Sequence, residues 1–257
     1  MKKKKKIVII TGASSGLGEE FALQLDQVLQ TIDEIWLIAR RRERLTELAR
    51  KLRIPTRVFP MDLTDEKEID TLEHILRTTD PSVCMLINCA GYGLMGTFSD
   101  LKLEEQAGML DLNCEALMRI TYICIPYMPG NSRLIQLASS AAFLPQQNFA
   151  VYAATKSFVL SFSRALQEEL RERKIWVTAV CPGPVDTEFF DIAEQYGTTL
   201  AVKKLTLVSA QRVVAQALED SRKKRTVSVC SLPIQGFWLL SKLLPHSLIM
   251  KVMSRMK

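Results

Sequence analysis

Histidine is scarce in this chain, and closely spaced cysteine pairs are absent from it. Only His74 and His246 occur among the 257 residues, and the six cysteines form no C-x-x-C pair. Because zinc sites are built from closely spaced cysteine, histidine and carboxylate ligands, the sequence predicts no metal site and argues against a zinc-dependent enzyme. Cys84 and Cys181 lie in apolar runs, so we expect buried, reduced thiols.

Long hydrophobic runs are absent too. A transmembrane helix needs about 18 or more consecutive apolar residues, and no run reaches that length. Lys2–Lys6 are followed by only four apolar residues, Ile7–Ile10, which is too short for the core of a signal peptide. We therefore expect a cytoplasmic protein.

Positive charge is concentrated at the N-terminus. The net charge is +6, and Lys2–Lys6 supply five of these charges, so the rest of the chain is close to neutral. Such a short tail favours a solvated leader before a strand over a nucleic-acid surface, and we expect no nucleic-acid partner. With 47% hydrophobic and 24% charged residues, the chain has an ordinary globular composition.

Short β-branched runs alternate with longer amphipathic segments. Strands are predicted at 6–10, 34–39, 56–60, 83–88, 133–138 and 175–181, and a weaker one at 225–229. Helices are predicted near 16–29, 41–53, 65–78, 103–127, 151–173 and 208–220. This alternation predicts an α/β fold with one parallel sheet of about seven strands and helices on both faces. No linker marks a second domain, so residues 1–257 are predicted to form one domain, with 231–257 as a helical extension.

A glycine-rich turn follows the first predicted strand. Thr11 to Gly18 have the sequence T-G-A-S-S-G-L-G, and a helical pattern begins at Leu17. Glycines let a pyrophosphate approach backbone N–H groups closely, and the N-terminus of a helix adds a partial positive charge. A strand, a glycine turn and a helix in this order predict a dinucleotide site.

The second predicted strand ends in Arg40-Arg41-Arg42, where an NAD site usually has an acidic residue. A guanidinium group instead matches a 2′-phosphate. Arg40 and Arg41 therefore predict a preference for NADP(H) over NAD(H). The alternative is that these arginines are only the solvated start of the following helix.

Tyr152 and Lys156 are four residues apart in a predicted helix, so their side chains share one face. A lysine cation beside a tyrosine favours the phenolate, and we expect it to lower the tyrosine pKa from about 10. Tyr152 would then serve as a general acid or base. Ser139 lies thirteen residues upstream, and we expect it to donate a hydrogen bond to a substrate oxygen. Taken singly, each of these residues more often has only a structural role.

Further motifs follow in a fixed order: Asn88-Cys89-Ala90-Gly91 after one predicted strand and Pro182-Gly183 after another. Together with the glycine turn, Ser139 and the Tyr152/Lys156 pair, they resemble the short-chain dehydrogenase/reductase family, in its ordinary branch. The resemblance covers roughly residues 5–230 and implies a Rossmann-like, doubly wound parallel sheet. Cys89 departs from the family, which usually has a second asparagine there, but the catalytic group is untouched.

The resemblance implies roles for a larger set of residues. Those expected around the cofactor are Gly12, Ser14, Ser15, Gly16, Leu17 and Gly18 at the pyrophosphate and adenosine ribose, Asp62 and Leu63 at the adenine, Asn88, Ala90 and Gly91 at the ribose side, Tyr152 and Lys156 beside the nicotinamide ribose, and Pro182, Gly183, Val185 and Thr187 at the nicotinamide. The expected catalytic residues are Asn113, Ser139, Tyr152 and Lys156, with Asn113 linked to the lysine through water.

These residues predict hydride transfer between NADPH and a hydrophobic ketone, or the reverse reaction on a secondary alcohol. An apolar lid over 187–207 and an apolar cleft favour a steroid-like or acyl-chain substrate. The lid residues are Phe189, Phe190, Ile192, Tyr196 and Leu200, and the cleft residues are Leu94, Met95, Phe143, Leu144 and Phe149. The alternative is a catalytically idle NADPH-binding sensor or scaffold, for which an intact Ser/Tyr/Lys set would be unnecessary.

The C-terminal extension is apolar and basic, with two short amphipathic helices separated by Pro245. Such helices can lie on a membrane surface, pack over the substrate cleft or pack between subunits. We favour the cleft or the subunit interface over the membrane. The family resemblance implies a homodimer or homotetramer.

Overall fold

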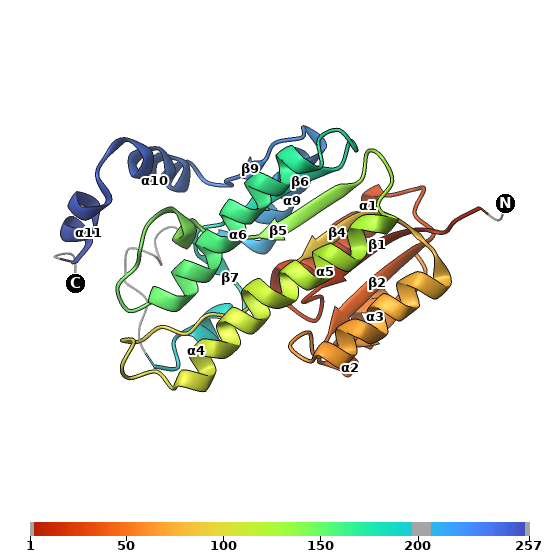
Figure 1. The fold of residues 1–257 in the computed structure, drawn as a ribbon, viewed down its shortest axis with the longest axis horizontal. Coiled ribbons are helices and arrows are strands. Elements are labelled where there is room, and N and C mark those ends of the chain that lie inside the picture. The colour runs from red at the N-terminus through yellow and green to blue at the C-terminus, as the bar shows by residue number, and fades with distance from the viewer. Residues whose placement is uncertain (1–2, 197–206, 255–257) are drawn as a thin grey trace.

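The computed structural model describes residues 3–196 and 207–254. Within them, seven parallel strands form one sheet in the order β3-β2-β1-β4-β5-β6-β9 (Figure 1). The strands are β1 (Lys6–Thr11), β2 (Glu34–Ala39), β3 (Thr56–Pro60), β4 (Ser82–Asn88), β5 (Arg133–Leu137), β6 (Trp176–Val180) and β9 (Val227–Ser228). The predicted doubly wound α/β sheet is therefore confirmed. Its strand order reverses between β1 and β4, which is where such sheets bind ligands.

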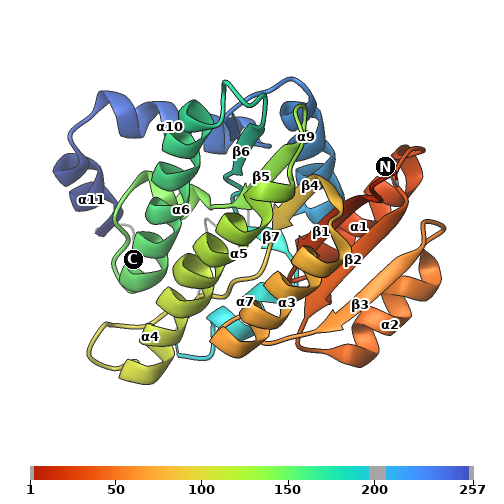
Figure 2. The same ribbon diagram turned by 45° about the vertical axis from the view of Figure 1, so that its right-hand side comes forward.

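Helices cover both faces of the sheet (Figure 2). One face carries α1 (Gly16–Val28), α2 (Arg42–Lys51) and α9 (Ala210–Arg222), and the other α3 (Glu66–Thr79), α4 (Leu103–Leu110), α5 (Leu117–Cys124) and α6 (Ala150–Glu169). The helices α1, α2, α3, α5, α6 and α9 bury apolar stripes against the strands, whereas Met109 of α4 packs in a separate cluster around Tyr152. In α3 this stripe is Ile69, Leu72 and Leu76, and the helix is capped at its start by Asp65, which accepts a hydrogen bond from the Lys67 N–H.

The long helix predicted over 103–127 is interrupted. Between α4 and α5, residues Asp111–Ala116 form a π-helical segment, and Ile125–Tyr127 end the element as a 3₁₀ turn. Local apolar spacing does not distinguish an α-turn from a π-turn, so the sequence did not predict this feature. π-turns are frequent at functional sites, and this one contains Asn113.

The segments nearest the carboxyl edge of the sheet are short. The sequence analysis did not predict three short elements here. They are β7 (Val185–Asp186) and β8 (Val208–Ser209), which form a two-stranded sheet, and the helix α7 (Phe189–Ala193). The helices α10 (Leu232–Leu243) and α11 (His246–Ser254) lie on the side of the molecule away from β3 and are separated at Pro245 as expected (Figure 2).

Among the described residues, no helix is long and apolar enough to span a membrane. No group of three or more histidine, cysteine or acidic side chains in the same ranges could hold a metal ion. The cysteines are free thiols, of which Cys124 and Cys181 are buried. Cys84 is only partly buried, which corrects the expectation from its apolar run.

Candidate active site

The turn after β1 depends on glycine at two positions. Gly12 has a φ of +65°, and a Cβ atom there would lie 2.7 Å from the backbone nitrogen of Ala90. A Cβ on Gly18 would lie 2.3 Å from the carbonyl oxygen of Gly12. The residue before α1, Ser15, makes no side-chain capping bond to the helix. Gly16, Leu17 and Gly18 line the cavity described next, so the first backbone N–H groups of α1 border it in a cradle suited to a phosphate.

A cavity of about 850 Å³ opens at the carboxyl ends of the strands. This is a typical volume for a ligand site. Its lining includes nearly all the residues expected around a cofactor: Gly12, Ser14, Ser15, Gly16, Leu17, Gly18, Arg40, Arg41, Asp62, Leu63, Ala90, Gly91, Tyr152, Lys156, Pro182, Gly183, Val185 and Thr187. Ser139 lines the same cavity.

Asn88 departs from the expectation. Its side chain is buried within the protein, where the amide donates to Thr121 Oγ1 at 3.1 Å and to Gln136 Oε1 at 2.9 Å. Asn88 is not among the residues that line the cavity. These bonds join β4 to β5 and α5, so the side chain supports the sheet instead of lining the expected ribose site.

Asn113 also uses its amide group inside the protein. The amide nitrogen donates to the Tyr92 carbonyl oxygen at 2.8 Å and to Thr155 Oγ1 at 3.0 Å, and the amide oxygen accepts from the Tyr92 N–H. A Cβ on Gly91 would lie 2.7 Å from this oxygen and 3.4 Å from Lys156 Nζ. Asn113 thus fixes the loop that borders the lysine, and its link to Lys156 through water stays a prediction.

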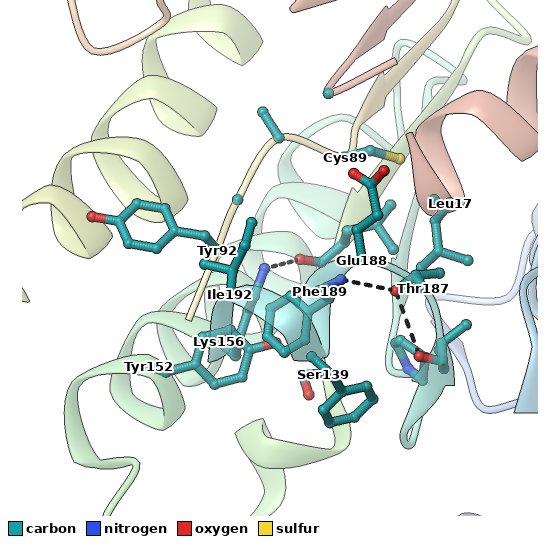
Figure 3. A pocket seen from close by; sticks show the side chains of 18 of the residues that line it. Leu17, Cys89, Tyr92, Ser139, Tyr152, Lys156, Thr187, Glu188, Phe189 and Ile192 are labelled. Carbon is teal, nitrogen blue, oxygen red and sulfur yellow. Dashed lines mark hydrogen bonds between the residues drawn. The ribbon is translucent and has the colours of Figure 1, made fainter. Parts of the chain in front are cut away.

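Tyr152 and Lys156 lie one turn apart on α6 and are both buried. Lys156 Nζ donates to the carbonyl oxygen of Leu137 at 2.7 Å and lies 5.7 Å from the centre of the Tyr152 ring. Figure 3 shows Ser139, Tyr152 and Lys156 gathered at one end of the cavity, beside Phe189. The three residues expected to act together are brought together by the fold.

The expected lowering of the Tyr152 pKa is wrong for this structure. Burial raises the pKa of Tyr152 to about 12, because the phenolate would lose its hydration, and the nearby Ser139 hydroxyl opposes this shift only in part. Burial also lowers the pKa of Lys156 to about 8. The sequence shows the spacing of the two residues, but it does not show how little water reaches them.

Ser139 follows β5 and caps the 3₁₀ turn Ser140–Phe143. Its Oγ accepts a hydrogen bond from the Ala141 N–H at 3.1 Å, which fixes the rotamer and leaves its own O–H to donate. The neighbouring Ser140 is held through its backbone N–H, which donates to the Pro182 carbonyl oxygen at 2.8 Å.

The arginines after β2 have different surroundings. Arg41 Nε lies 3.2 Å from Ser14 Oγ, and its Nη2 lies 2.6 Å from Ser15 Oγ. Arg41 therefore adjoins the glycine-rich turn after β1, which we call the phosphate turn. Arg40 is 74% exposed and lies 3.8 Å from an Asp62 carboxylate oxygen. Of the two arginines proposed from the sequence, Arg41 is the better placed for a phosphate.

Two further residues complete this charged group. Glu188 forms ion pairs with both Arg41 and Arg44, across sequence separations of 147 and 144 residues. Sequence analysis did not select either Arg44 or Glu188. The position of Glu188, directly after Thr187, was the one available signal.

The apolar part of the cavity agrees only partly with the prediction. Leu94, Met95 and Phe149 line it, whereas Phe143 and Leu144 do not. Phe143 instead packs against the rings of Phe237 and Trp238. Of the lid residues, Phe189, Phe190 and Ile192 line the cavity, Tyr196 donates its hydroxyl to Glu105 Oε1 at 2.8 Å, and Leu200 lies outside the described residues.

The helix α10 contributes to the same wall. Pro233, Ile234 and Phe237 line the cavity. A Cβ on Gly183 would lie 2.8 Å from Ile234, so the helix packs closely on the loop after β6. Leu240 and Leu243, on the same helix, are exposed. One face of α10 therefore lies over the cleft, which is one of the two positions that the sequence analysis favoured over a membrane surface.

Residues 6–197 match the short chain dehydrogenase family, and the chain belongs to this family of oxidoreductases. An uncharacterized oxidoreductase of Staphylococcus epidermidis is 32% identical over 188 residues, which are 72% of this chain and 80% of the relative.

Solved structures show the same fold. A short-chain dehydrogenase from Sphingobium yanoikuyae, in complex with NADPH, is 28% identical, with a TM-score of 0.80 over 97% of this chain and 95% of that one. A bulky-bulky ketone specific alcohol dehydrogenase from Comamonas testosteroni is 24% identical, with a TM-score of 0.75 over 98% of this chain and 95% of that one. At this lower identity the likeness shows the fold alone.

Proposed function

We propose that the protein is an NADP(H)-dependent oxidoreductase that interconverts a hydrophobic ketone and its secondary alcohol. The observation that carries this proposal is the meeting of Ser139, Tyr152 and Lys156 in one cavity with the glycine turn and Arg41. The Sphingobium relative, which binds NADPH, supports the choice of cofactor.

The cavity residues fit a dinucleotide. Gly12 and Gly18 leave no room for a side chain, and the start of α1 presents backbone N–H groups suited to the pyrophosphate. Arg41, with Ser14 and Ser15, provides a cationic and hydroxyl site suited to a 2′-phosphate. When bound, a nicotinamide ring supplies or accepts the hydride.

The chain's own groups then handle the proton and the charge. With a pKa of about 12, Tyr152 is protonated at neutral pH and can donate its proton to a carbonyl oxygen. Lys156, with a pKa of about 8, is mostly protonated and stabilises the phenolate that this transfer leaves. Ser139 donates a hydrogen bond to the same substrate oxygen, on which negative charge develops.

The walls of the substrate end favour an apolar compound. Leu94, Met95, Phe149, Phe189 and Phe237 line this part of the cavity. Burying apolar groups of a ligand against them stabilises a complex by about 25 cal/mol per Å² of surface. A ketone on a steroid-like or acyl-chain skeleton fits this surface.

The proposal is tested by NADPH consumption over a panel of steroid, aliphatic and aromatic ketones. Wild type is expected to turn over at least one hydrophobic ketone, and Tyr152→Phe to lose about 10²-fold or more of this activity, because the proton donor is gone. NADPH binding, followed by fluorescence, should be nearly unchanged. Tyr122→Phe, at an exposed position, is the matched control.

Full turnover by Tyr152→Phe would exclude the proposed role of the phenol. Tight NADPH binding without any turnover over the whole panel would instead favour the sensor or scaffold alternative.

A further inference from the structure

Glu188 joins two parts of the cavity that are far apart in the sequence. It is the residue immediately before α7, and its Oε2 lies 3.0 Å from Arg41 Nη1. Its other carboxylate oxygen is hydrogen-bonded to Arg44 in α2. We call Arg41, Arg44 and Glu188 the arginine clasp. Figure 3 shows Glu188 beside Thr187 among the residues that line the cavity.

One end of the clasp is the site suited to a 2′-phosphate. Arg41 contacts Glu188 through Nη1, but its Nε and Nη2 contact the hydroxyl groups of Ser14 and Ser15. The same guanidinium is thus shared between a carboxylate of the protein and the phosphate turn. A bound 2′-phosphate and the Glu188 carboxylate would compete for one cation.

The other end of the clasp is the wall over the candidate catalytic tyrosine. Phe189, next to Glu188, has its ring centre 5.4 Å from that of Tyr152. At the end of α7, the carbonyl oxygen of Ala193 accepts a hydrogen bond from the Met95 N–H at 2.8 Å. Glu188 is the N-cap residue of the helix whose Phe189 ring packs against Tyr152.

The clasp is ionised and partly exposed to solvent. Hydrogen bonds from Arg44 and Arg41 lower the pKa of Glu188, so the carboxylate is ionised at neutral pH. The side chains are partly exposed, 43% for Arg41 and 41% for Glu188. Exposed ion pairs are weak, whereas a phosphate brings more charge and more acceptor oxygens to the same guanidinium groups.

We propose that Glu188 is a specificity-determining residue, because its carboxylate competes with the 2′-phosphate of NADP(H) for Arg41 and Arg44. When the phosphate replaces the carboxylate at these arginines, α7 is released. This inference rests on the proposed use of NADP(H). Glu188 then sets how strongly the protein distinguishes NADP(H) from NAD(H), and the wall over Tyr152 responds to the phosphate.

The first test compares two nucleotide fragments that differ only in the 2′-phosphate, 2′,5′-ADP and 5′-AMP, by titration calorimetry. The measured quantity is the Kd of 5′-AMP divided by that of 2′,5′-ADP. We expect Glu188→Gln to raise this ratio about fivefold or more, because the competing charge is removed and the shape is kept. Glu43→Gln, at an exposed acid in the first turn of α2, should change it by less than about twofold.

The second test follows hydrogen exchange of residues 188–193 in the wild type. Saturating 2′,5′-ADP should speed exchange in α7, whereas 5′-AMP should not. In Glu188→Gln the exchange should already be fast, with no further response to either nucleotide.

The outcomes separate the two proposals. A wild type that binds both fragments equally well would contradict the NADP(H) preference of the proposed function. An unchanged or lower ratio in Glu188→Gln would overturn competition at the clasp. Unaltered exchange of α7 with saturating 2′,5′-ADP would overturn the release of the helix.

Discussion

The Lys156 ammonium group lies 5.7 Å from the centre of the Tyr152 ring, and its hydrogen bond goes to the carbonyl oxygen of Leu137 at the end of β5, at 2.7 Å. The sheet, and not the phenol, thus sets the position of the lysine. A cation held in this way can stabilise a phenolate when one forms, and it does not depend on the tyrosine for its own place.

The burial of Lys156 predicts a pH-dependent cost to stability. Its pKa falls from 10.5 to about 8 in the folded protein, so between these values the unfolded chain binds more protons and the lysine's contribution to stability rises with pH. Lys156→Met should lack this rise. The difference in unfolding free energy between the two proteins should therefore shift in favour of the wild type from pH 8 to 10, by at most roughly 3 kcal/mol.

Denaturant titrations at several pH values measure this difference. Only the difference is informative, because burial, with no contribution from Lys156, also raises the pKa of Cys124, and its titration therefore affects both proteins alike. A pH-independent difference would show that the buried lysine keeps an ordinary pKa.

Ser139 and Ser140 are adjacent and both line the cavity, but only Ser139 is expected to stabilise charge on the substrate oxygen. Ser139→Ala should lower kcat by about 10²-fold, the usual cost of losing such a donor, with a small change in KM. Ser140→Ala should retain kcat within about threefold. Steady-state kinetics on one ketone distinguish the two variants, and equal losses would argue that the turn is simply intolerant of alanine.

Gly93 makes room for the ring of Tyr152. A Cβ there would lie 2.5 Å from Cδ2 of Tyr152, so Gly93→Ala should push the phenol out of line. A misplacement of about 1 Å can cost about 10²-fold in rate, and we expect kcat to fall by that order with NADPH binding retained.

Gly236→Ala is the matched control, because a Cβ at this exposed position of α10 has no neighbour within 4 Å among the described residues. It should keep full activity and gain about 0.5–1 kcal/mol of stability from the better helix propensity of alanine. If Gly93→Ala were as active as this control, the ring would have space that the structure does not show.

The strands of the seven-stranded sheet were predictable mainly because buried parallel strands carry unbroken apolar runs, as in Ile7–Ile10 and Ile35–Ile38. The placing of Tyr152 and Lys156 on one face of a helix was predictable because the i,i+4 geometry is local. Features set by distant residues were not. The clasp forms only because the fold brings Glu188 next to Arg41, which is 147 residues away in the sequence. The direction of the Tyr152 pKa shift depends on burial of the side chain by several elements.

The two arginines predicted to recognise a 2′-phosphate should differ in effect. Arg41 contacts both serine hydroxyls of the phosphate turn, whereas Arg40 is exposed beside Asp62. Losing a charged hydrogen-bonding group costs about 1.5–3 kcal/mol, so Arg41→Ala should weaken NADPH binding roughly 10- to 100-fold and leave NADH binding nearly unchanged. Arg40→Ala should have a smaller effect.

Fluorescence titration with both cofactors measures these affinities, with Arg42→Ala, at the exposed first residue of α2, as control. If Arg40→Ala lost more NADPH affinity than Arg41→Ala, our assignment of phosphate recognition to Arg41 would be wrong. Tighter binding of NADH than NADPH by the wild type would contradict the cofactor preference itself.

The last prediction concerns α10, whose two faces differ. Phe237 lines the cavity and packs on Phe143 with ring centres 6.3 Å apart, whereas Leu240 on the same helix is exposed. Phe237→Ala should raise KM for bulky hydrophobic ketones roughly tenfold or more, because an apolar wall is lost, with a smaller change in kcat. Leu240→Ala should leave KM unchanged, and NADPH affinity should stay constant in both. Equal KM values in the two variants would show that the substrate does not contact α10. The wall formed by α10 would then give no reason to expect a preference for bulky apolar ketones.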